Sequence, residues 1–276
     1  MERLTTFEEL RAYAGAAPRP LGLVPTMGAV HAGHMSLVER SSRECAATVA
    51  TLFVNPAQFD DKGDFARYPR DAEGDLAALA AAGADAVFTP PEREVYPAGF
   101  ATWVRMGGPA LPLEGAARPG HFDGVATIVA KLLIGALPDA AYFGQKDGQQ
   151  VAVVRRLVAD LGLSVRVVAA PTVREADGLA LSSRNGLLNA EQRRGAAALH
   201  RALQAGAAAL GEGAGAAEAA CRAVLAKEPQ VSAVDYVALV DQATMAPWSG
   251  QGEAMLAAAV RVGSVRLIDN LLMSAD

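Results

Sequence analysis

Residues 21–34 read Leu-Gly-Leu-Val-Pro-Thr-Met-Gly-Ala-Val-His-Ala-Gly-His, and a helix-like stretch, Met35–Arg40, follows them. The apolar run predicts a strand, the glycine-containing segment a turn, and the region after it the start of a helix. Main-chain N–H groups and the imidazoles of His31 and His34 then converge at a helix N-terminus, which favours an anion. The H-x-G-H spacing therefore predicts a phosphate site and suggests adenylyl transfer.

Other structures are compatible with parts of this segment. Gly28 and Gly33 bracket four residues as in a Walker A loop, but that loop requires Lys and then Ser or Thr, where this chain has His34 and Met35. A zinc site needs further ligands, and no acidic or cysteine residue is spaced close by. Two histidines near a helix start are also common as solvent-facing or core residues, so the segment alone does not decide the chemistry.

Composition limits the class of protein. The 276 residues carry 25 basic and 30 acidic side chains, a formal net charge of −5, which argues against binding long nucleic acid by phosphate neutralisation. The first ten residues lack the apolar core of a signal peptide and predict a helix with a capping box of Thr6 and Glu9. The longest apolar stretch, 125–137, contains a lysine and is too short to cross a bilayer. Cys45 and Cys221 lie far apart, which is typical of thiols in a reducing compartment, so we expect a cytoplasmic protein.

Strand-like and helix-like runs alternate along most of the chain. Strands are predicted at 49–54, 86–89, 140–144 and 165–170, and helices at 71–82, 125–136 and 149–161. This alternation is typical of a Rossmann-like α/β fold, a parallel sheet with helices on both faces. Ligands bind such sheets at the carboxyl ends of the strands.

The pattern changes after about residue 185. Two Ala/Gly-rich helices, 190–210 and 216–226, precede strands at 235–240, 254–262 and 265–268. We therefore expect two domains, a Rossmann-like domain of residues 1–176 and a smaller α+β domain of residues 185–276.

Three further polar segments lie where the predicted sheet places a site. They are Asn55-Pro56-Ala57-Gln58-Phe59, the stretch 142–150 and the stretch 177–185. Asn55 and Gln58 supply neutral hydrogen-bonding amides, Lys146 follows a strand end, and serine hydroxyls beside Arg184 suit a phosphate. Each feature is common in ordinary turns and helix caps, but their coincidence at strand ends and at the change of domain favours one binding site.

Taken together, the segments resemble the pantothenate synthetase family, ATP-dependent ligases of the HIGH-motif nucleotidyltransferase superfamily. The resemblance covers nearly the whole chain. It rests on residues 25–28 and 31–34, Asn55-Pro56-x-Gln58-Phe59, Tyr68-Pro69-Arg70, Glu114-Gly115, residues 118–122, Phe143-Gly144-x-Lys146-Asp147-x-Gln149-Gln150, residues 177–185 and Arg266-Leu267-Ile268-Asp269-Asn270.

This resemblance implies condensation of (R)-pantoate with β-alanine to pantothenate through a pantoyl adenylate, with release of AMP and pyrophosphate. It implies that residues 1–176 bind ATP and pantoate and that the smaller domain closes as a lid. Mg²⁺ is expected to arrive with ATP, bound mainly by phosphate oxygens and water, so that no metal-binding side chains are predicted. A homodimer is also implied, with no nucleic-acid or membrane partner.

Site residues follow from the same resemblance. His34 is implied as the proton donor, His31 as a ligand rather than a donor, and Lys146 and Arg184 as cations that stabilise phosphate charge. Gln58 and Gln150 are implied pantoate ligands, and Gln58 also contacts β-alanine. ATP binding is implied for Met27, Gly28, Ala29, Val30, His31, Ala32, Gly33, His34, Gly144, Gln145, Lys146, Asp147, Val173, Leu181, Ser182, Ser183 and Arg184.

Two positions depart from the family's commonest pattern. Gln145 stands where glutamate is frequent and Gly148 where an aromatic residue or alanine is frequent; neither is expected to carry chemistry. Glycine at 148 is expected to loosen the start of its helix by ~1 kcal/mol relative to alanine.

Two other functions stay open on the sequence. One is a different H-x-G-H nucleotidyltransferase, which need not keep the glutamines at 58 and 150. The other is a catalytically silent nucleotide-binding module. An aminoacyl-tRNA synthetase fits less well because it requires a basic RNA-binding surface.

Overall fold

Strand β2, the run that precedes the H-x-G-H segment, lies in the middle of a parallel sheet. The computed structural model describes residues 1–59 and 62–274, and within them the strands of this sheet follow the order β1-β4-β3-β2-β5-β6. Every pairing is parallel, with Val24 opposite Ala50 on one side of β2 and Leu23 opposite Ala141 on the other. The strands are β1 (Glu2–Leu4), β2 (Leu21–Val24), β3 (Ala47–Thr51), β4 (Ala86–Phe88), β5 (Ala140–Gly144) and β6 (Arg166–Ala170). The predicted Rossmann-like fold is confirmed.

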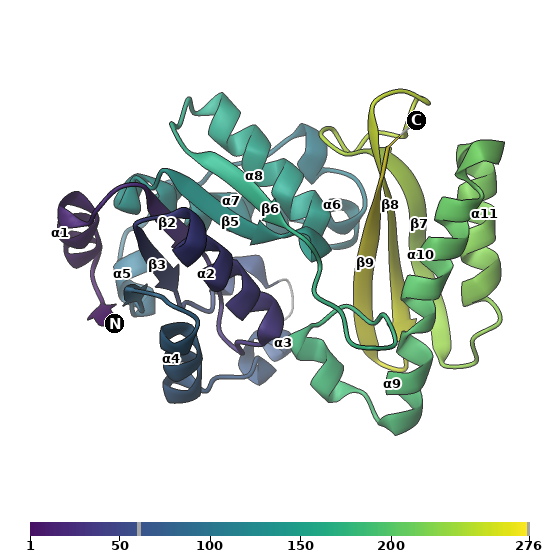
Figure 1. Ribbon diagram of the computed structural model, residues 1–276, viewed down its shortest axis with the longest axis horizontal. Helices are drawn as coiled ribbons and strands as arrows, with labels where there is room; N and C mark the ends of the chain where they lie inside the picture. The colour runs from purple at the N-terminus through teal and green to yellow at the C-terminus, as the bar shows by residue number, and fades with distance from the viewer. Residues whose placement is uncertain (60–61, 275–276) are drawn as a thin grey trace. The chain divides into compact units, whose positions relative to one another are not determined.

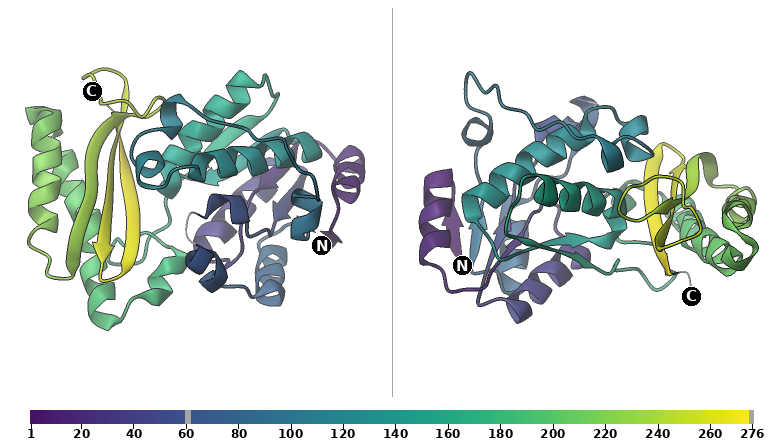
Figure 2. Two further views of the ribbon diagram at one scale, coloured as in Figure 1. Left: turned by 180° about the vertical axis from the view of Figure 1, so that it is seen from behind. Right: turned by 90° about the horizontal axis from the view of Figure 1, so that it is seen from above.

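Helices cover both faces of the sheet (Figures 1 and 2). Helices α2 (Ala32–Glu44) and α4 (Ala72–Ala81) bury Leu37, Val38 and Leu79 against one face, while α7 (His121–Ala136) lies on the opposite face. The remaining helices of this part are α1 (Phe7–Ala16), η1 (Pro56–Gln58), α3 (Lys62–Arg67), α5 (Glu92–Val95), η2 (Gly108–Ala110), α6 (Glu114–Ala117), η3 (Gln145–Asp147) and α8 (Gly148–Asp160).

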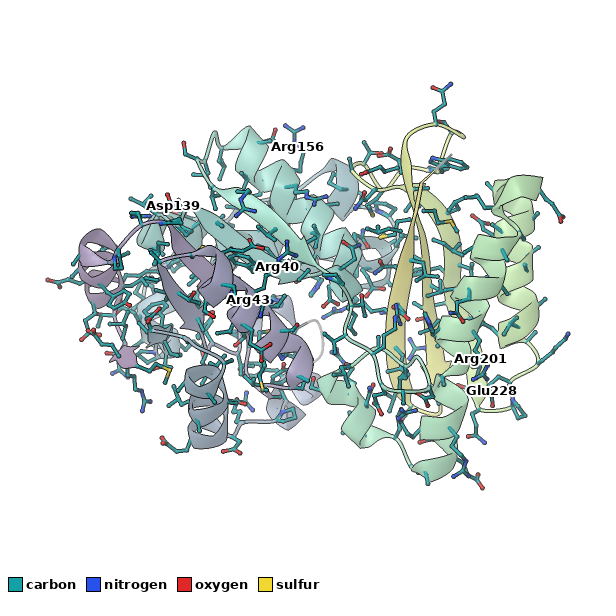
Figure 3. The ribbon with its side chains drawn as sticks, in the orientation of Figure 1. Arg40, Arg43, Asp139, Arg156, Arg201 and Glu228 are labelled. Atoms are coloured by element: carbon teal, nitrogen blue, oxygen red, sulfur yellow. The ribbon has the colours of Figure 1, made fainter. Side chains whose placement is uncertain are left out.

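A three-stranded antiparallel sheet of order β7-β8-β9 follows, with the helix pair α10 and α11 on one face. Its elements are η4 (Ser183–Leu187), α9 (Ala190–Ala196), α10 (Ala198–Ala208), η5 (Leu210–Glu212), α11 (Ala214–Leu225), β7 (Val231–Asp241), β8 (Glu253–Val262) and β9 (Val265–Ser274). Leu203 and Leu225 from the helices pack on Leu256 of β8, which gives this sheet its own core. Arg201 of α10 reaches Glu228 beyond α11 at 3.7 Å (Figure 3).

The chain divides into two compact units. The first comprises Met1–Gly144 and Val153–Ala170, and the second comprises Gln145–Ala152 and Pro171–Asp276. Residues 145–152 therefore belong with the C-terminal sheet rather than with the strand that they follow. None of the helices within 1–59 and 62–274 has the length and apolarity needed to span a membrane.

Differences from the predicted elements have local causes. The predicted strand at 49–54 ends at Thr51, because Leu52 and Phe53 donate their N–H groups to Phe88 and Thr26 outside the ladder. Strand β1 was not predicted, since three residues at a sheet edge carry too little pattern. The predicted capping box is confirmed: Glu9 N–H donates to Thr6 Oγ1 at 3.1 Å and Thr6 N–H to Glu9 Oε2 at 3.1 Å.

Candidate active site

The H-x-G-H turn places two imidazoles side by side at the start of α2. His31 is the N-cap of this helix, and its Nδ1 accepts from the N–H of Gly33 at 3.1 Å. His34 Nδ1 accepts from the N–H of His31 at 3.4 Å, and the ring centroids lie 4.1 Å apart. A neutral imidazole that accepts at Nδ1 carries its proton on Nε2. Both rings are therefore set to offer an Nε2–H at the positive end of a helix.

A buried carboxylate holds the turn itself. Asp75 of α4, 6% exposed, accepts from the N–H of Val30 at 2.7 Å and of Ala29 at 2.9 Å. Gly28 has φ +93°, and a Cβ there would lie 2.9 Å from both Asp75 Oδ2 and Leu52 Cδ1. Glycine at 28 thus supplies a left-handed backbone and leaves room for the carboxylate.

Asp75 was not predicted from the sequence, although a signal existed. In the predicted helix 71–82, Asp75 shares a face with Leu76, Leu79 and Ala82, which are buried against the sheet. A carboxylate within an apolar stripe requires a buried partner. Here the partners are the main-chain N–H groups of Ala29 and Val30, in the segment predicted to bind phosphate.

Gln58 lies in a buried polar network at the end of η1. Asn55 Nδ2 donates to Gln58 Oε1 at 2.8 Å, and Asn55 Oδ1 accepts from the hydroxyl of Tyr96 at 2.7 Å. Burial raises the pKa of Tyr96 to about 12, so its hydroxyl keeps the proton that it donates at neutral pH. Because Asn55 donates this hydrogen bond, the Gln58 amide turns its oxygen towards Asn55. The NH₂ group of Gln58 therefore points away from Asn55 and can donate to another acceptor.

The main chain of Gln58 is held by two residues that precede and open α7. Arg118 Nη2 donates to the Gln58 carbonyl oxygen at 3.0 Å, and His121 Nδ1 lies 2.9 Å from the same oxygen. The two side chains are 3.3 Å apart, between Arg118 Nη1 and His121 Nε2. The close approach of α7 to η1 depends on Gly124, because a Cβ there would lie 2.1 Å from the Ala57 carbonyl oxygen. The sequence assigned no role to Arg118 or His121; the structure places both on the predicted substrate residue.

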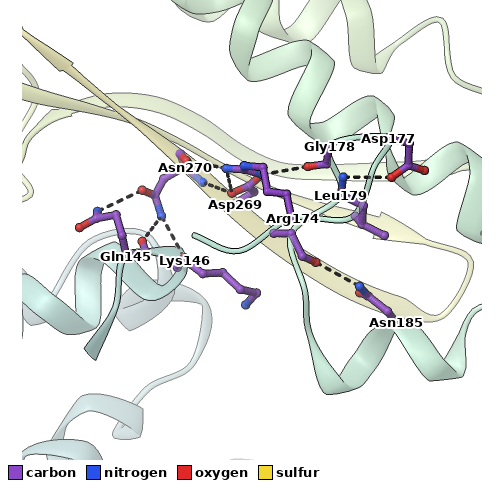
Figure 4. Close-up of polar contacts among 10 residues, drawn as sticks. Gln145, Lys146, Arg174, Asp177, Gly178, Leu179, Asn185, Asp269 and Asn270 are labelled. Carbon is purple, nitrogen blue, oxygen red and sulfur yellow. Dashed lines mark hydrogen bonds and ion pairs between the residues drawn. The ribbon is translucent and has the colours of Figure 1, made fainter. Parts of the chain in front are cut away.

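In the second unit, Lys146 lies on η3, directly after Gly144 and Gln145. Its ammonium is 3.4 Å from Asp147 Oδ1, and its side chain is 20% exposed. Asn270 of β9 donates from Nδ2 to the carbonyl oxygens of Gln145 at 2.8 Å and Lys146 at 2.9 Å (Figure 4). The predicted ATP-binding segment 145–147 is thus packed against the last strand of the chain.

Gly148 has a packing reason in the same cluster. A Cβ at 148 would lie 2.5 Å from Met255 Sδ and 2.8 Å from Gln145 Nε2. An alanine at 148 would therefore require the ends of the flexible Gln145 and Met255 side chains to shift. Of the two glutamines that follow, Gln149 is buried and the predicted pantoate ligand Gln150 is half-buried.

The predicted residues 173–184 form a hairpin and a short helix in the second unit. Leu181 N–H donates to the Val173 carbonyl at 3.0 Å, which closes the hairpin. Ser182 is the N-cap of η4, and its Oγ accepts from the N–H of Arg184 at 3.2 Å. Leu181, Ser182, Ser183 and Arg184 are all half-buried.

The sequence-predicted residues therefore fall into two groups, one in each unit. Met27–His34, Gln58 and Gly144 lie in the first, and residues 145–147, Gln150, Val173 and Leu181–Arg184 lie in the second. Within the first unit the two histidines are brought into contact, and within the second unit Asp269 and Asn270 of β9 connect the Lys146 segment with the hairpin.

The parallel sheet, the glycine turn after β2 and the paired histidines at the start of α2 define an α/β protein of Rossmann-like fold with an H-x-G-H turn after a central strand. A family model described as pantoate-beta-alanine ligase matches residues 2–272. The chain belongs to the pantoate-beta-alanine ligase family.

Individual relatives agree with this assignment. A pantothenate synthetase of Herpetosiphon aurantiacus is 51% identical over 278 residues, which cover 99% of this chain and 100% of that protein. The crystal structure of pantothenate synthetase from Thermus thermophilus matches with a TM-score of 0.92 and 50% identity, covering 98% of this chain and 99% of that one. Pantoate-beta-alanine ligase from Francisella tularensis, complexed with beta-gamma ATP and beta-alanine, matches with a TM-score of 0.81 and 31% identity, covering 99% and 97%.

Proposed function

We propose that this protein is an ATP-dependent ligase that joins (R)-pantoate to β-alanine. The pantoate carboxylate attacks the α-phosphate of ATP, which gives pantoyl adenylate and pyrophosphate, and the β-alanine amine then displaces AMP. The observation that carries the proposal is the paired-histidine site at the start of α2 in a chain that matches the family from residue 2 to 272.

The first step needs donors and cations around the α-phosphate and the departing pyrophosphate. We assign ATP binding to the segments Met27–His34, Gly144–Asp147, Val173 and Leu181–Arg184. His34 is the proposed proton donor, and the Nε2–H that its hydrogen bonding favours supports this role. Lys146 and Arg184 are proposed to stabilise the charge that develops on the phosphates.

Pantoate is assigned to Gln58 and Gln150, and β-alanine to Gln58. An amide whose oxygen is taken by Asn55 offers its NH₂ group, which suits a carboxylate or hydroxyl oxygen of the substrate. The network around Gln58 therefore supports a fixed donor rather than a rotating amide.

Mg²⁺ is proposed to enter with ATP, held mainly by phosphate oxygens and water. Within residues 1–59 and 62–274, no three His, Cys, Asp or Glu side chains are grouped to hold a metal ion. Such a group is not required when the phosphates are the principal ligands.

The test is release of AMP and pyrophosphate by the purified protein with ATP and Mg²⁺, adding pantoate and β-alanine separately and together. We expect AMP only with both substrates, pantoate-dependent exchange of pyrophosphate into ATP without β-alanine, and a large fall in both rates, to a small residual rate, in His34→Ala and Lys146→Ala. Lys227→Ala, an exposed lysine of the second unit, is the matched control and keeps full activity. Turnover without pantoate would indicate another transferase, and ATP binding without turnover a silent module.

A homodimer in the cytoplasm is also part of the proposal. Sedimentation at micromolar concentration tests the assembly, and a mass near that of one chain, 28.5 kDa, would refute it.

A further inference from the structure

Two consecutive polar residues, Asp269 and Asn270, are buried within strand β9. Asp269 is 3% exposed and Asn270 is 5% exposed. A burial of this kind is costly unless each polar atom has a partner. The partners identify what the two side chains do.

Asn270 binds the main-chain carbonyl groups of Gln145 and Lys146. Its Nδ2 donates to two successive carbonyl oxygens, at 2.8 Å and 2.9 Å, and its Oδ1 accepts from Gln145 Nε2 at 3.2 Å (Figure 4). One amide therefore fixes two carbonyls and one side chain of the segment that carries Lys146. A lysine has a long flexible stem, so the position of its main chain decides which region its ammonium reaches.

Asp269 is connected to the hairpin that precedes Leu181–Arg184. Its two oxygens accept from Arg174 Nη1 at 2.5 Å and Nη2 at 3.0 Å, a bidentate pair. Arg174 Nη1 also donates to the Gly178 carbonyl at 3.1 Å, and residue 174 forms an antiparallel bridge with Ala180. The carboxylate accepts in addition from the N–H of Asn270 at 2.8 Å, which links the two contacts.

We propose that Asp269 and Asn270 are positioning residues for ATP: Asn270 sets the main chain of Lys146, and Asp269, through Arg174, sets the hairpin before Leu181–Arg184. The inference rests on the proposed function, because that function assigns the phosphates to Lys146 and Arg184. A replacement of Asn270 releases two carbonyls and lets the Lys146 segment shift, and a displacement of about 1 Å at a reacting group costs about 100-fold in rate.

A double-mutant cycle between Asn270 and Lys146 tests the proposal. Asn270→Ala is expected to lower kcat/KM for ATP about 100-fold per folded molecule, with the KM for β-alanine unchanged within about twofold. In a Lys146→Ala background the same replacement is expected to cost no more than about twofold, because the side chain that it positions is already absent. If the alanine variant does not fold, Asn270→Asp is used in its place. It keeps the size of the side chain, removes the N–H donors to the two carbonyls and is expected to give the same result.

The matched control is Asp235→Asn. Asp235 of β7 pairs with Arg261 at 3.2 Å and Arg266 at 2.6 Å, so it joins strands of the same sheet through charge. The Asp235→Asn replacement is expected to lower the urea concentration at the midpoint of unfolding and to leave kcat/KM for ATP unchanged. If Asn270 were merely structural, its replacement would leave kcat/KM for ATP unchanged, as in this control, or would lower it by the same factor in the wild-type and Lys146→Ala backgrounds. Either result overturns the proposal.

ATP affinity measured by calorimetry separates this inference from the function on which it rests. If the wild-type protein binds ATP but shows no pantoate-dependent exchange, the proposed function fails. The positioning role then still predicts that Asn270→Ala loses affinity for ATP and that Asp235→Asn keeps it. Equal affinity in all three proteins, or no binding by the wild type, overturns the positioning role.

Discussion

Replacement of Asp75 tests the turn that presents the two histidines. Asp75→Ala removes both acceptors for the N–H groups of Ala29 and Val30 and leaves a small cavity beside Gly28. Hydrogen bonds to a charged group contribute about 1.5–3 kcal/mol each, so the free energy of unfolding is expected to fall by about 4 kcal/mol. Asp75→Asn keeps one acceptor but turns an NH₂ group towards the other N–H, and it is expected to cost about half as much.

Activity should fall further than stability alone explains. In the wild type the Asp75 carboxylate fixes residues 29 and 30, directly before His31. In Asp75→Ala the two imidazoles therefore lose this support. A drop of about 100-fold in pantoate-dependent pyrophosphate exchange is expected in the folded Asp75→Ala protein. Urea titration followed by circular dichroism gives the stability, and exchange is measured at a concentration of urea where the variant is still folded.

Asp71→Ala is the matched control for this experiment. Asp71 caps the same helix, α4, and accepts from the N–H of Gly74 at 3.1 Å. Loss of such a cap costs about 1 kcal/mol and leaves the turn intact, so exchange stays at the wild-type rate. The reasoning is refuted if Asp75→Ala resembles Asp71→Ala in both measurements.

Two further predictions concern residues whose roles the structure defines. Arg118→Ala removes a donor to the Gln58 carbonyl and is expected to raise the KM for pantoate about tenfold, equivalent to about 1.4 kcal/mol, with the KM for ATP unchanged in steady-state kinetics; an unchanged pantoate KM would contradict it. Burial, and then the charge of Arg174, lower the pKa of His200 from its ordinary 6.5. The unfolded chain therefore takes up this proton first, so stability is fully present above about pH 6.5 and is lost as the pH falls below it. Urea titrations from pH 7 to 5.5 should show a smaller loss in His200→Gln than in the wild type, and parallel curves would count against the argument.

Apolar patterning predicted the sheet closely where flanking residues are unambiguous. Strand β5 has the predicted bounds, 140–144, because a proline and an aspartate precede the apolar run and a polar turn follows it. The predicted helix 71–82 became α4 with Asp71 as its N-cap. In both cases neighbouring residues supply the physical signal, so a single sequence is sufficient.

Strand β9 shows where the same approach fails. The predicted strand ended at residue 268 because two polar residues, Asp269 and Asn270, interrupt the apolar pattern, yet the strand continues to Ser274. Their partners, Arg174 and the Gln145–Lys146 segment, lie 95 and more residues away in the chain. No local propensity contains that information, since a buried polar residue in a strand is explained only by what it binds.

The same physical arrangement recurs at each site segment. Asp75 holds the N–H groups before His31, Arg118 and His121 hold the carbonyl of Gln58, and Asn270 holds the carbonyl of Lys146. In each case a side chain from a distant element satisfies the main chain of the segment. A turn or short helix leaves main-chain groups without regular partners, and a buried one must find them elsewhere. Other elements therefore supply main-chain partners in addition to those that the segments supply themselves through His31, His34 and Ser182. Replacing such a supporting residue should change the kinetic constants for the substrates proposed for its segment and leave those for the others unchanged, which distinguishes support of the site from general stability.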